Sequence, residues 1–214
     1  MIPNRARLQG ESTFFPFVYI LNAAHNSRDS AKEKSEGSNL HRVSSALFCA
    51  FAVEAYLNHL GEEALPYWDI VEPKMSWQSK LDLLARHFQA TTDFGARPFQ
   101  TIKQLFKFRD KLAHGKTETW EFEHEFDPAN DNAHDPKWLS EYWTDAAVDR
   151  AIEDTEAVIE FLHEKAGFDP MDLHRMGSSF AAVKLPGGLK AEDIRGITRP
   201  QQNDARPDAP PHSE

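Results

Sequence analysis

The sequence predicts an all-α fold, an antiparallel bundle of four or five helices with a disordered C-terminal tail. Apolar residues recur at helical spacing in several separate segments, and proline and glycine residues punctuate them. No segment alternates strand and helix units, and short connections between amphipathic helices favour an antiparallel bundle. The 214 residues are 40% apolar, which is enough for one core of ordinary size.

The first two helices are predicted from their boundaries. The first runs from about Pro16 to Lys34, because proline suits a first helical turn. The second is capped by Ser38 or Asn39 and ends at or near Gly61. Its predicted buried stripe consists of Leu40, Val43, Leu47, Ala50 and Leu57.

Three further helices follow a loop marked by Pro66 and Pro73. The third helix begins near Ser76, and the fourth runs from Pro98 to Gly115. The fifth begins at Asp135-Pro136 and extends to about Ala166, with Gly167 after it. The stripe of this fifth helix is predicted to contain Leu139, Trp143, Ala146, Ile152, Ile159 and Leu162.

The predicted helical domain covers residues 14–167. Residues 1–13 are expected to be a flexible N-terminus, and residues 168–214 a tail with a short helical turn from Pro170 to Met176. After about Pro186 the chain is rich in Pro, Gly, Asp and Arg, and such a composition buries too little apolar surface to offset ordering entropy. We therefore expect disorder there.

Cysteine content and hydropathy predict the cellular environment. The single cysteine, Cys49, excludes an intramolecular disulfide, so a reducing compartment is the default. No apolar stretch is judged long enough to span a bilayer. The sequence thus predicts a cytoplasmic protein without a membrane partner.

Two charged residues fall on predicted apolar faces. Glu54 shares the stripe of Leu47 and Ala50, with Asn58 one turn further on, and Arg109 follows Ile102. A buried charge is costly unless it is paired, so we expect Glu54 to pair with Arg109 across two helices, supported by Asn58. An ion pair that only fixes packing is an equally good interpretation of this pattern.

His114 adds a chemical interpretation to this pair. It lies five residues after Arg109, just before Gly115. A histidine there caps free carbonyls in the simplest case. If the last turn unwinds at Gly115, however, His114 reaches the side of Arg109. Arginine binds phosphate bidentately and histidine titrates near neutral pH, so the two residues suit phosphodiester chemistry.

A basic run surrounds this segment. Five basic residues and one acid, Asp110, occur between positions 103 and 116 of a chain whose net charge is −10. The negative net charge of the chain argues against a general nucleic-acid binder. Most runs of like charge are solvated helix faces. As an RNA-binding surface, the run would use Lys103, Lys107, Lys111 and Lys116.

The segments around Arg109 and Glu54 resemble the HEPN domain family. The run Arg109-Asp110-Lys111-Leu112-Ala113-His114 matches the family's signature of arginine, four to six residues and histidine. The stretch FKFRDKLAHG looks like the HEPN form of this helix, and SSALFCAFAVEAYLNHLG (residues 44–61) is similar to the HEPN helix that carries a buried acid. The resemblance covers roughly residues 14–167, with Asp110 standing where asparagine is commonest.

The resemblance implies a function that the spacing alone does not. HEPN domains are helical bundles that commonly dimerise, which brings two Arg–His motifs into one cleft. Many are metal-independent endoribonucleases in toxin–antitoxin, phage-defence or RNA-processing systems. For this chain, the resemblance implies that Arg109, His114 and Asp110 are catalytic, that RNA is the substrate, and that no cofactor or metal takes part. It also implies a homodimer and, if the protein is a toxin, a cognate antitoxin protein.

Two other interpretations stay open at this point. Some HEPN domains have lost catalysis and bind a partner protein or a nucleotide. Alternatively, the chain is a purely structural helical bundle in which Glu54 and Arg109 serve packing alone.

Overall fold

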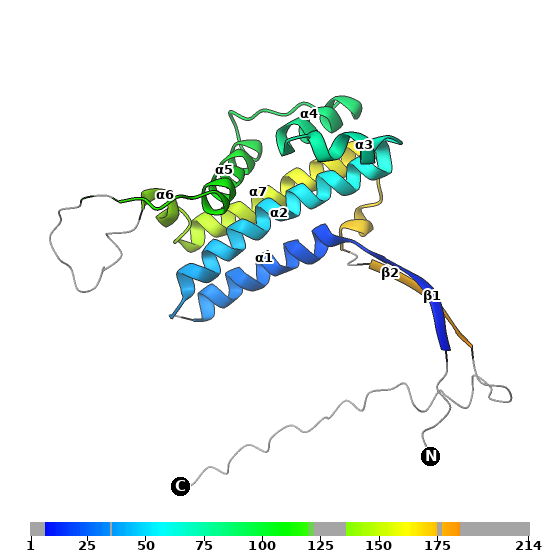
Figure 1. Cartoon of the computed structure of the whole chain (residues 1–214), viewed down its shortest axis with the longest axis horizontal. Coiled ribbons are helices and arrows are strands. Elements are labelled where there is room, and N and C mark those ends of the chain that lie inside the picture. Colours follow the sequence, from blue (N-terminus) through cyan, green and yellow to red (C-terminus); the bar gives the residue numbers. More distant parts are fainter. Residues whose placement is uncertain (1–6, 35, 120, 122–135, 175–176, 185–214) are drawn as a thin grey trace, which may run out of the picture. The chain divides into compact units, whose positions relative to one another are not determined.

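The chain is mostly helical, as predicted. The computed structural model describes residues 7–34, 36–119, 121, 136–174 and 177–184, and seven α-helices occur among them (Figure 1). The α-helices are α1 (Pro16–Glu33), α2 (Ser38–Ala64), α3 (Trp68–Val71), α4 (Trp77–His87), α5 (Phe99–Ala113), α6 (Lys137–Ser140) and α7 (Asp145–Ala166). The 3₁₀ turns are η1 (Glu72–Lys74) and η2 (Pro170–His174), and the strands are β1 (Arg7–Phe14) and β2 (Gly177–Lys184).

The chain divides into two units. The helical unit spans Phe14–Gly177, and the other consists of Met1–Thr13 with Ser178–Glu214. In the latter, β1 and β2 pair in a two-stranded sheet and run in opposite directions (Figure 1). The sequence pattern predicts no strand in either segment. Pairing satisfies backbone groups between segments far apart in the chain, and a local pattern does not reveal it. The predicted disorder after about Pro186 lies outside the described residues.

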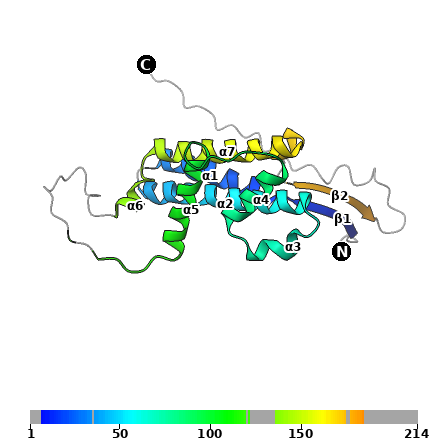
Figure 2. The same cartoon turned by 90° about the horizontal axis from the view of Figure 1, so that it is seen from above.

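Helix α2 lies at the centre of the helical unit. In Figure 1, α1 lies below α2, and α4 and α5 lie above it, while Figure 2 shows α7 along the same helix. Cys49, Val53 and Leu57 have no exposed surface. Among the described residues, only α2 is long and apolar enough to cross a membrane, and half of that stretch is buried within the protein. A core helix of this kind has the same composition as a membrane span.

The start of α2 differs from the prediction. Gly37 precedes the helix in the left-handed region at φ 72°, and no side chain caps it. Ser38 Oγ and Asn39 Oδ1 instead accept hydrogen bonds from Arg42 Nη1, at 3.0 and 3.1 Å. Leu40, predicted to be buried, is 74% exposed, because it lies about 100° around the helix from Leu57.

α2 was predicted to end at or near Gly61, and it continues three residues further, to Ala64. The indole of Trp68 packs directly on the Gly61 backbone. A Cβ atom at Gly61 would lie 2.2 Å from Trp68 Cε2. Glycine is therefore needed here for the close approach of α3, which occupies part of the predicted loop.

The predicted fifth helix is divided in two. α6 ends at Ser140, and α7 begins after Thr144, whose hydroxyl accepts a hydrogen bond from the Ala147 N–H at 3.2 Å. The break restarts the helical register, so Ala146 is exposed and Val148 is buried instead. The predicted end at Gly167 is confirmed by its left-handed conformation, φ 73°.

The other predicted helices correspond to observed ones. α1 begins at Pro16, and α4 follows Ser76, whose Oγ accepts a hydrogen bond from the Ser79 N–H at 3.2 Å. α5 begins after Pro98. Just before it, Arg97 donates from Nε and Nη2 to the nearly buried carboxylate of Asp154, both at 2.8 Å. This bidentate contact ties the start of α5 to α7.

Two histidines lie where α1, α2 and α7 meet. His163 is buried: its Nε2 donates to the carbonyl oxygen of Asp169 at 2.8 Å, and its Nδ1 lies 3.2 Å from Tyr56 Oη. The ring of His59 stacks on Phe17, with 5.2 Å between centroids. Burial lowers the pKa of His59 below its ordinary value of 6.5, and His163 adds to this effect, whereas Glu62, Glu63 and Asp172 oppose it.

Gly61→Ala should destabilise the protein by about 1–3 kcal/mol, because the new methyl group overlaps the Trp68 indole. Urea denaturation measures this loss. In a Trp68→Leu background the same substitution should cost much less, because the smaller side chain can yield. An equal cost in both backgrounds would contradict the close packing of α3 on α2.

The pH dependence of stability should contain a contribution from His59. Its pKa is lower in the folded state, so the unfolded state binds the proton first as pH falls, and stability is lost below about pH 6.5. His59→Phe keeps the stacking on Phe17 but cannot titrate. Thermal unfolding from pH 7.5 to 5 should therefore decline less steeply in this variant than in the wild type. The exposed His87→Gln serves as the control, and identical slopes for wild type and His59→Phe would refute the assignment.

Candidate functional site

Glu54 and Arg109 meet where α5 packs on α2. Arg109 Nη1 donates a hydrogen bond to Glu54 Oε2 at 2.6 Å, so the predicted pairing is present. Arg109 Nε lies 2.9 Å from Asp110 Oδ1, at ion-pair distance but without hydrogen-bond alignment. The guanidinium also lies over the ring of Phe106, 4.8 Å from its centroid. Three neighbours thus fix the position of Arg109.

The pair is half-buried. The side chains of Arg109 and Glu54 are 20% and 31% exposed, so both reach the edge of the α2–α5 contact. A pair at this depth keeps part of its hydration, and its energetic contribution is smaller than that of a fully buried pair. It is also within reach of a solvent-borne ligand. Since guanidinium has five N–H donors, the contacts with Glu54 and Asp110 leave donors for an additional anion.

Asn58 belongs to a different polar contact. Its Oδ1 accepts a hydrogen bond from Lys80 Nζ of α4 at 2.8 Å. Lys80 is 3% exposed, and its ammonium also donates to Glu72 of η1. The structure therefore places Asn58 one turn from Glu54 but directs it to α4 instead of α5.

His114 stands at the C-terminal end of α5. It is exposed, and its backbone N–H donates to the Asp110 carbonyl oxygen at 2.9 Å. It comes five positions after Arg109, which corresponds to about 140° around the axis of a regular helix. No hydrogen bond, ion pair or ring contact joins His114 to Glu54, Arg109 or the side chain of Asp110. A single chain thus places Arg109 and His114 at one helix end without contact between their side chains.

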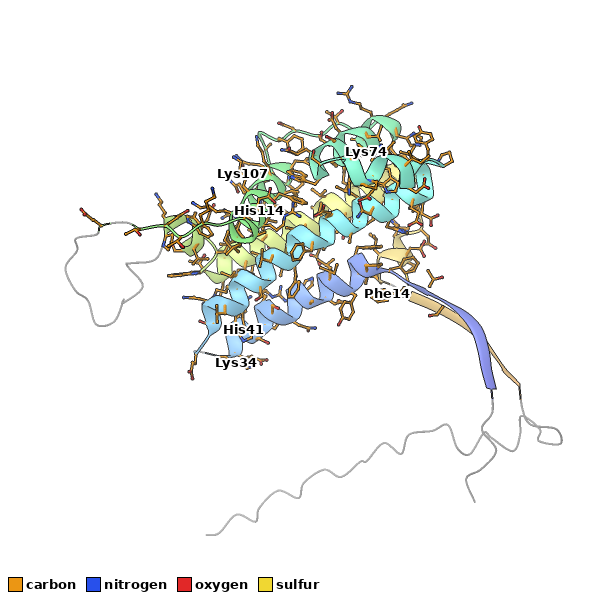
Figure 3. The ribbon with its side chains drawn as sticks, in the orientation of Figure 1. Phe14, Lys34, His41, Lys74, Lys107 and His114 are labelled. Carbon is orange, nitrogen blue, oxygen red and sulfur yellow. The ribbon has the colours of Figure 1, made fainter. Side chains whose placement is uncertain are left out.

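Gly115 makes the turn after His114 tight. A Cβ atom at this position would lie 2.7 Å from the carbonyl oxygen of Lys111. The last turn of α5 therefore stays closed up to His114, and the unwinding that would bring His114 to Arg109 is absent. Figure 3 labels His114 together with Lys107 of the same helix, and both side chains are exposed.

The predicted basic residues form a row on α5. Lys103, Lys107 and Lys111 follow each other at four-residue spacing and share one face of the helix. Lys111 is partly neutralised, because its Nζ lies 3.3 Å from Glu118 and 4.7 Å from the ring centroid of Trp138. Lys107 and Lys116 are exposed and Lys103 is half-buried. The row faces solvent beside the helix end that carries His114.

Lys80 and His163 are buried polar residues that the sequence analysis missed. Lys80 follows Trp77 by three residues and precedes Leu81, so it lies on the apolar face of α4. His163 follows Ile159 by four residues on the stripe of α7. The criterion that selected Glu54, a polar residue on an apolar stripe, would have selected both. Among the described residues, no group of three or more His, Cys, Asp or Glu side chains is arranged to hold a metal ion.

Glu54 and Arg109 should be energetically coupled. Glu54→Gln and Arg109→Met should each lower the free energy of unfolding by roughly 1–2 kcal/mol, because each leaves a half-buried charge without its partner. The double variant should lose clearly less than the sum of the two. Denaturant unfolding measures the cycle. The exposed Arg86–Asp82 pair of α4 provides a matched control, with an expected coupling below about 0.5 kcal/mol. Additive losses at Glu54 and Arg109 would mean that their contact contributes nothing to stability.

No protein-family model matches this chain, and neither a curated protein nor a solved structure matches it. A function therefore has to be proposed from its own residues. Residues 44–61 lie on α2 and residues 106–113 on the C-terminal part of α5, and the two segments contact each other through Glu54 and Arg109.

Proposed function

We propose that this protein is a cytoplasmic, metal-independent endoribonuclease of the HEPN type, and that its long helices form the antiparallel bundle of that family. One observation carries the proposal. The Glu54–Arg109 contact joins the two helices that resemble HEPN helices, and His114 stands exposed at the end of the helix that holds Arg109.

The reaction would use groups of the RNA and three protein side chains. The ribose 2′-hydroxyl attacks the adjacent phosphorus, the bond to the 5′-oxygen breaks, and a 2′,3′-cyclic phosphate and a 5′-hydroxyl form. His114 transfers the proton as general base or acid, because histidine is the side chain that enzymes use most often for this step. Arg109 holds the scissile phosphate and stabilises its growing charge. Asp110, beside Arg109 and half-exposed, would orient the substrate or His114.

A homodimer completes the proposed site. Arg109 and His114 of one chain point about 140° apart around α5, so one chain does not present them to the same phosphate. A two-fold axis near α5 would bring the motifs of two chains into one cleft, as the HEPN resemblance implies. If the protein is a toxin or a phage-defence component, a cognate antitoxin protein would be a second partner.

Exposed lysines on α5 and just after it support RNA as the substrate. Lys107 and Lys116 would attract the phosphate backbone, with Lys103 beside them, and Lys111 would contribute less because Glu118 is near. Such contacts release counterions, so RNA binding should weaken steeply with salt.

A non-catalytic function is the second candidate, and a specific contact favours it. Arg109 is held by Glu54 at 2.6 Å and lies 2.9 Å from Asp110, so two carboxylates already offset its charge. An arginine in this position also suits a HEPN-like module that binds a partner protein or nucleotide, or a helical bundle in which the pair serves packing alone.

Purified protein should cleave a mixed RNA pool in excess EDTA and leave 2′,3′-cyclic phosphate ends. DNA and 2′-O-methyl RNA should remain intact, because neither has the nucleophile. His114→Ala should lose roughly 10²–10⁴-fold in rate, and Arg109→Ala at least about 10²-fold. Cleavage is followed on denaturing gels with end-labelled RNA.

The adjacent Arg86 and His87 of α4 provide the matched controls. Both are exposed and lie outside the site, so Arg86→Ala and His87→Ala should cleave like the wild type. A requirement for added metal, or full activity of both site variants, would refute the mechanism. If the wild type cleaves no RNA, the partner-binding candidate replaces the nuclease. Loss of stability without loss of any binding in Arg109→Ala would indicate the packing function.

A further inference from the structure

A second site lies between α1, α7 and η2. A cavity of about 170 Å³ opens there within the helical unit, and none of its lining residues belongs to α5. It is thus separate from the Glu54–Arg109 site and does not depend on the proposed nuclease function. Its walls combine apolar and charged side chains, which is the composition of a small-molecule site.

The apolar wall is formed by core residues. Phe17, Val18 and Ile159 line the cavity, and each is at most 5% exposed. Leu173 of η2 adds a further apolar side chain. Because core packing holds these residues, the cavity exists without a ligand. An apolar cavity of roughly 150 Å³ accepts benzene, so this one fits an apolar group the size of one aromatic ring.

The polar wall carries two carboxylates on one face of α7. Glu156 and Glu160 are one helical turn apart and both line the cavity. Glu156 Oε1 lies 2.8 Å from His25 Nε2 of α1, and His174 of η2 is the second histidine of the cavity. The two carboxylates thus lie next to an apolar surface.

The His25–Glu156 pair differs from the Lys32–Asp149 ion pair, which also joins α1 to α7. Lys32 Nζ donates to both carboxylate oxygens of Asp149 at 3.0 Å, and this pair lies outside the cavity. Asp149 is paired with an ammonium group, whereas the partner of Glu156 is an imidazole. The side chains of His25 and Glu156 are 30% and 39% exposed, so an incoming cation can reach the carboxylate.

We propose that this cavity binds a small primary amine whose apolar body is about one ring in size. The ammonium group would lie between Glu156 and Glu160, and the ring would pack against Phe17 and Ile159. A carboxylate ligand of the same size would meet the two negative charges instead. A metal ion is a poorer fit, because the described residues include no cluster of three or more suitable ligands.

Phenethylamine and phenylacetate test the proposal, since they share a ring and differ in charge. In two-dimensional NMR of the full chain at pH 7.5, phenethylamine should shift cavity resonances with saturation at low millimolar concentration or below. Phenylacetate should bind at least tenfold more weakly. Glu156→Gln, which keeps a hydrogen-bond acceptor for His25, should weaken phenethylamine binding at least tenfold. Ile159→Trp should abolish it by filling the cavity.

Glu164→Gln provides the control for charge on α7, because Glu164 is exposed and lies outside the cavity. It should bind phenethylamine like the wild type. Thermal unfolding of each variant separates loss of the site from loss of the fold. Absence of saturable shifts, equal binding of phenylacetate, or unchanged affinity in folded Glu156→Gln would overturn the proposal.

Discussion

The burial of α2 is the constraint on which the helical unit depends. Five other helices pack on it, so its inward-facing polar groups lose water and need partners from neighbouring elements. Four of these helices, α1, α4, α5 and α7, supply at least one partner each. The contacts are Ser45 Oγ to the Ala24 carbonyl oxygen of α1 at 2.8 Å, Asn58 to Lys80 of α4, Glu54 to Arg109 of α5 and Tyr56 to His163 of α7. The polar residues of α2 therefore help to determine which face of each neighbouring helix packs against α2.

This selection explains why Arg109 has both a structural and a chemical interpretation. Its contact with Glu54 fixes how α5 lies on α2, which any bundle of this kind requires. The same contact holds a guanidinium in one orientation at the molecular surface, which a phosphate site requires. A packing contact and a phosphate site would therefore have the same geometry at Arg109. They differ in whether the remaining donors of Arg109 meet a ligand.

The sequence predicted features that depend on local periodicity. Helix boundaries that depend on caps were predicted at the starts of α1, α4 and α5 and at the end of α7. The Glu54–Arg109 pairing was predicted because each helix carries one charge, of opposite sign, on its apolar stripe. Lys80 and His163 were within reach of the same criterion. Their partners were not, because Asn58 and Tyr56 come from another helix whose position no stripe reveals.

The wrong predictions share a physical cause. Glycine often marks a helix end, but Gly61 lies inside α2 and leaves room for the Trp68 indole. Ala146 was assigned by extending one register across a break that the cap at Thr144 creates. The pairing of β1 with β2 depends on segments at opposite ends of the chain. In each case a contact distant in sequence or a local break overrides a locally plausible pattern.

The polar pairs differ in how exposed their side chains are to water, and a ligand can reach only the exposed ones. The Lys80 side chain is 4% exposed and Tyr56 has no exposed surface, so a ligand has no access to either without disruption of the core. The Glu54–Arg109 and His25–Glu156 pairs, with side chains 20–39% exposed, lie at the edges of helix contacts. At that depth a charge is still near water, and an incoming phosphate or ammonium group can replace water instead of a packed side chain. The two pairs therefore combine fixed geometry with access, and a site for an exchangeable ligand requires both.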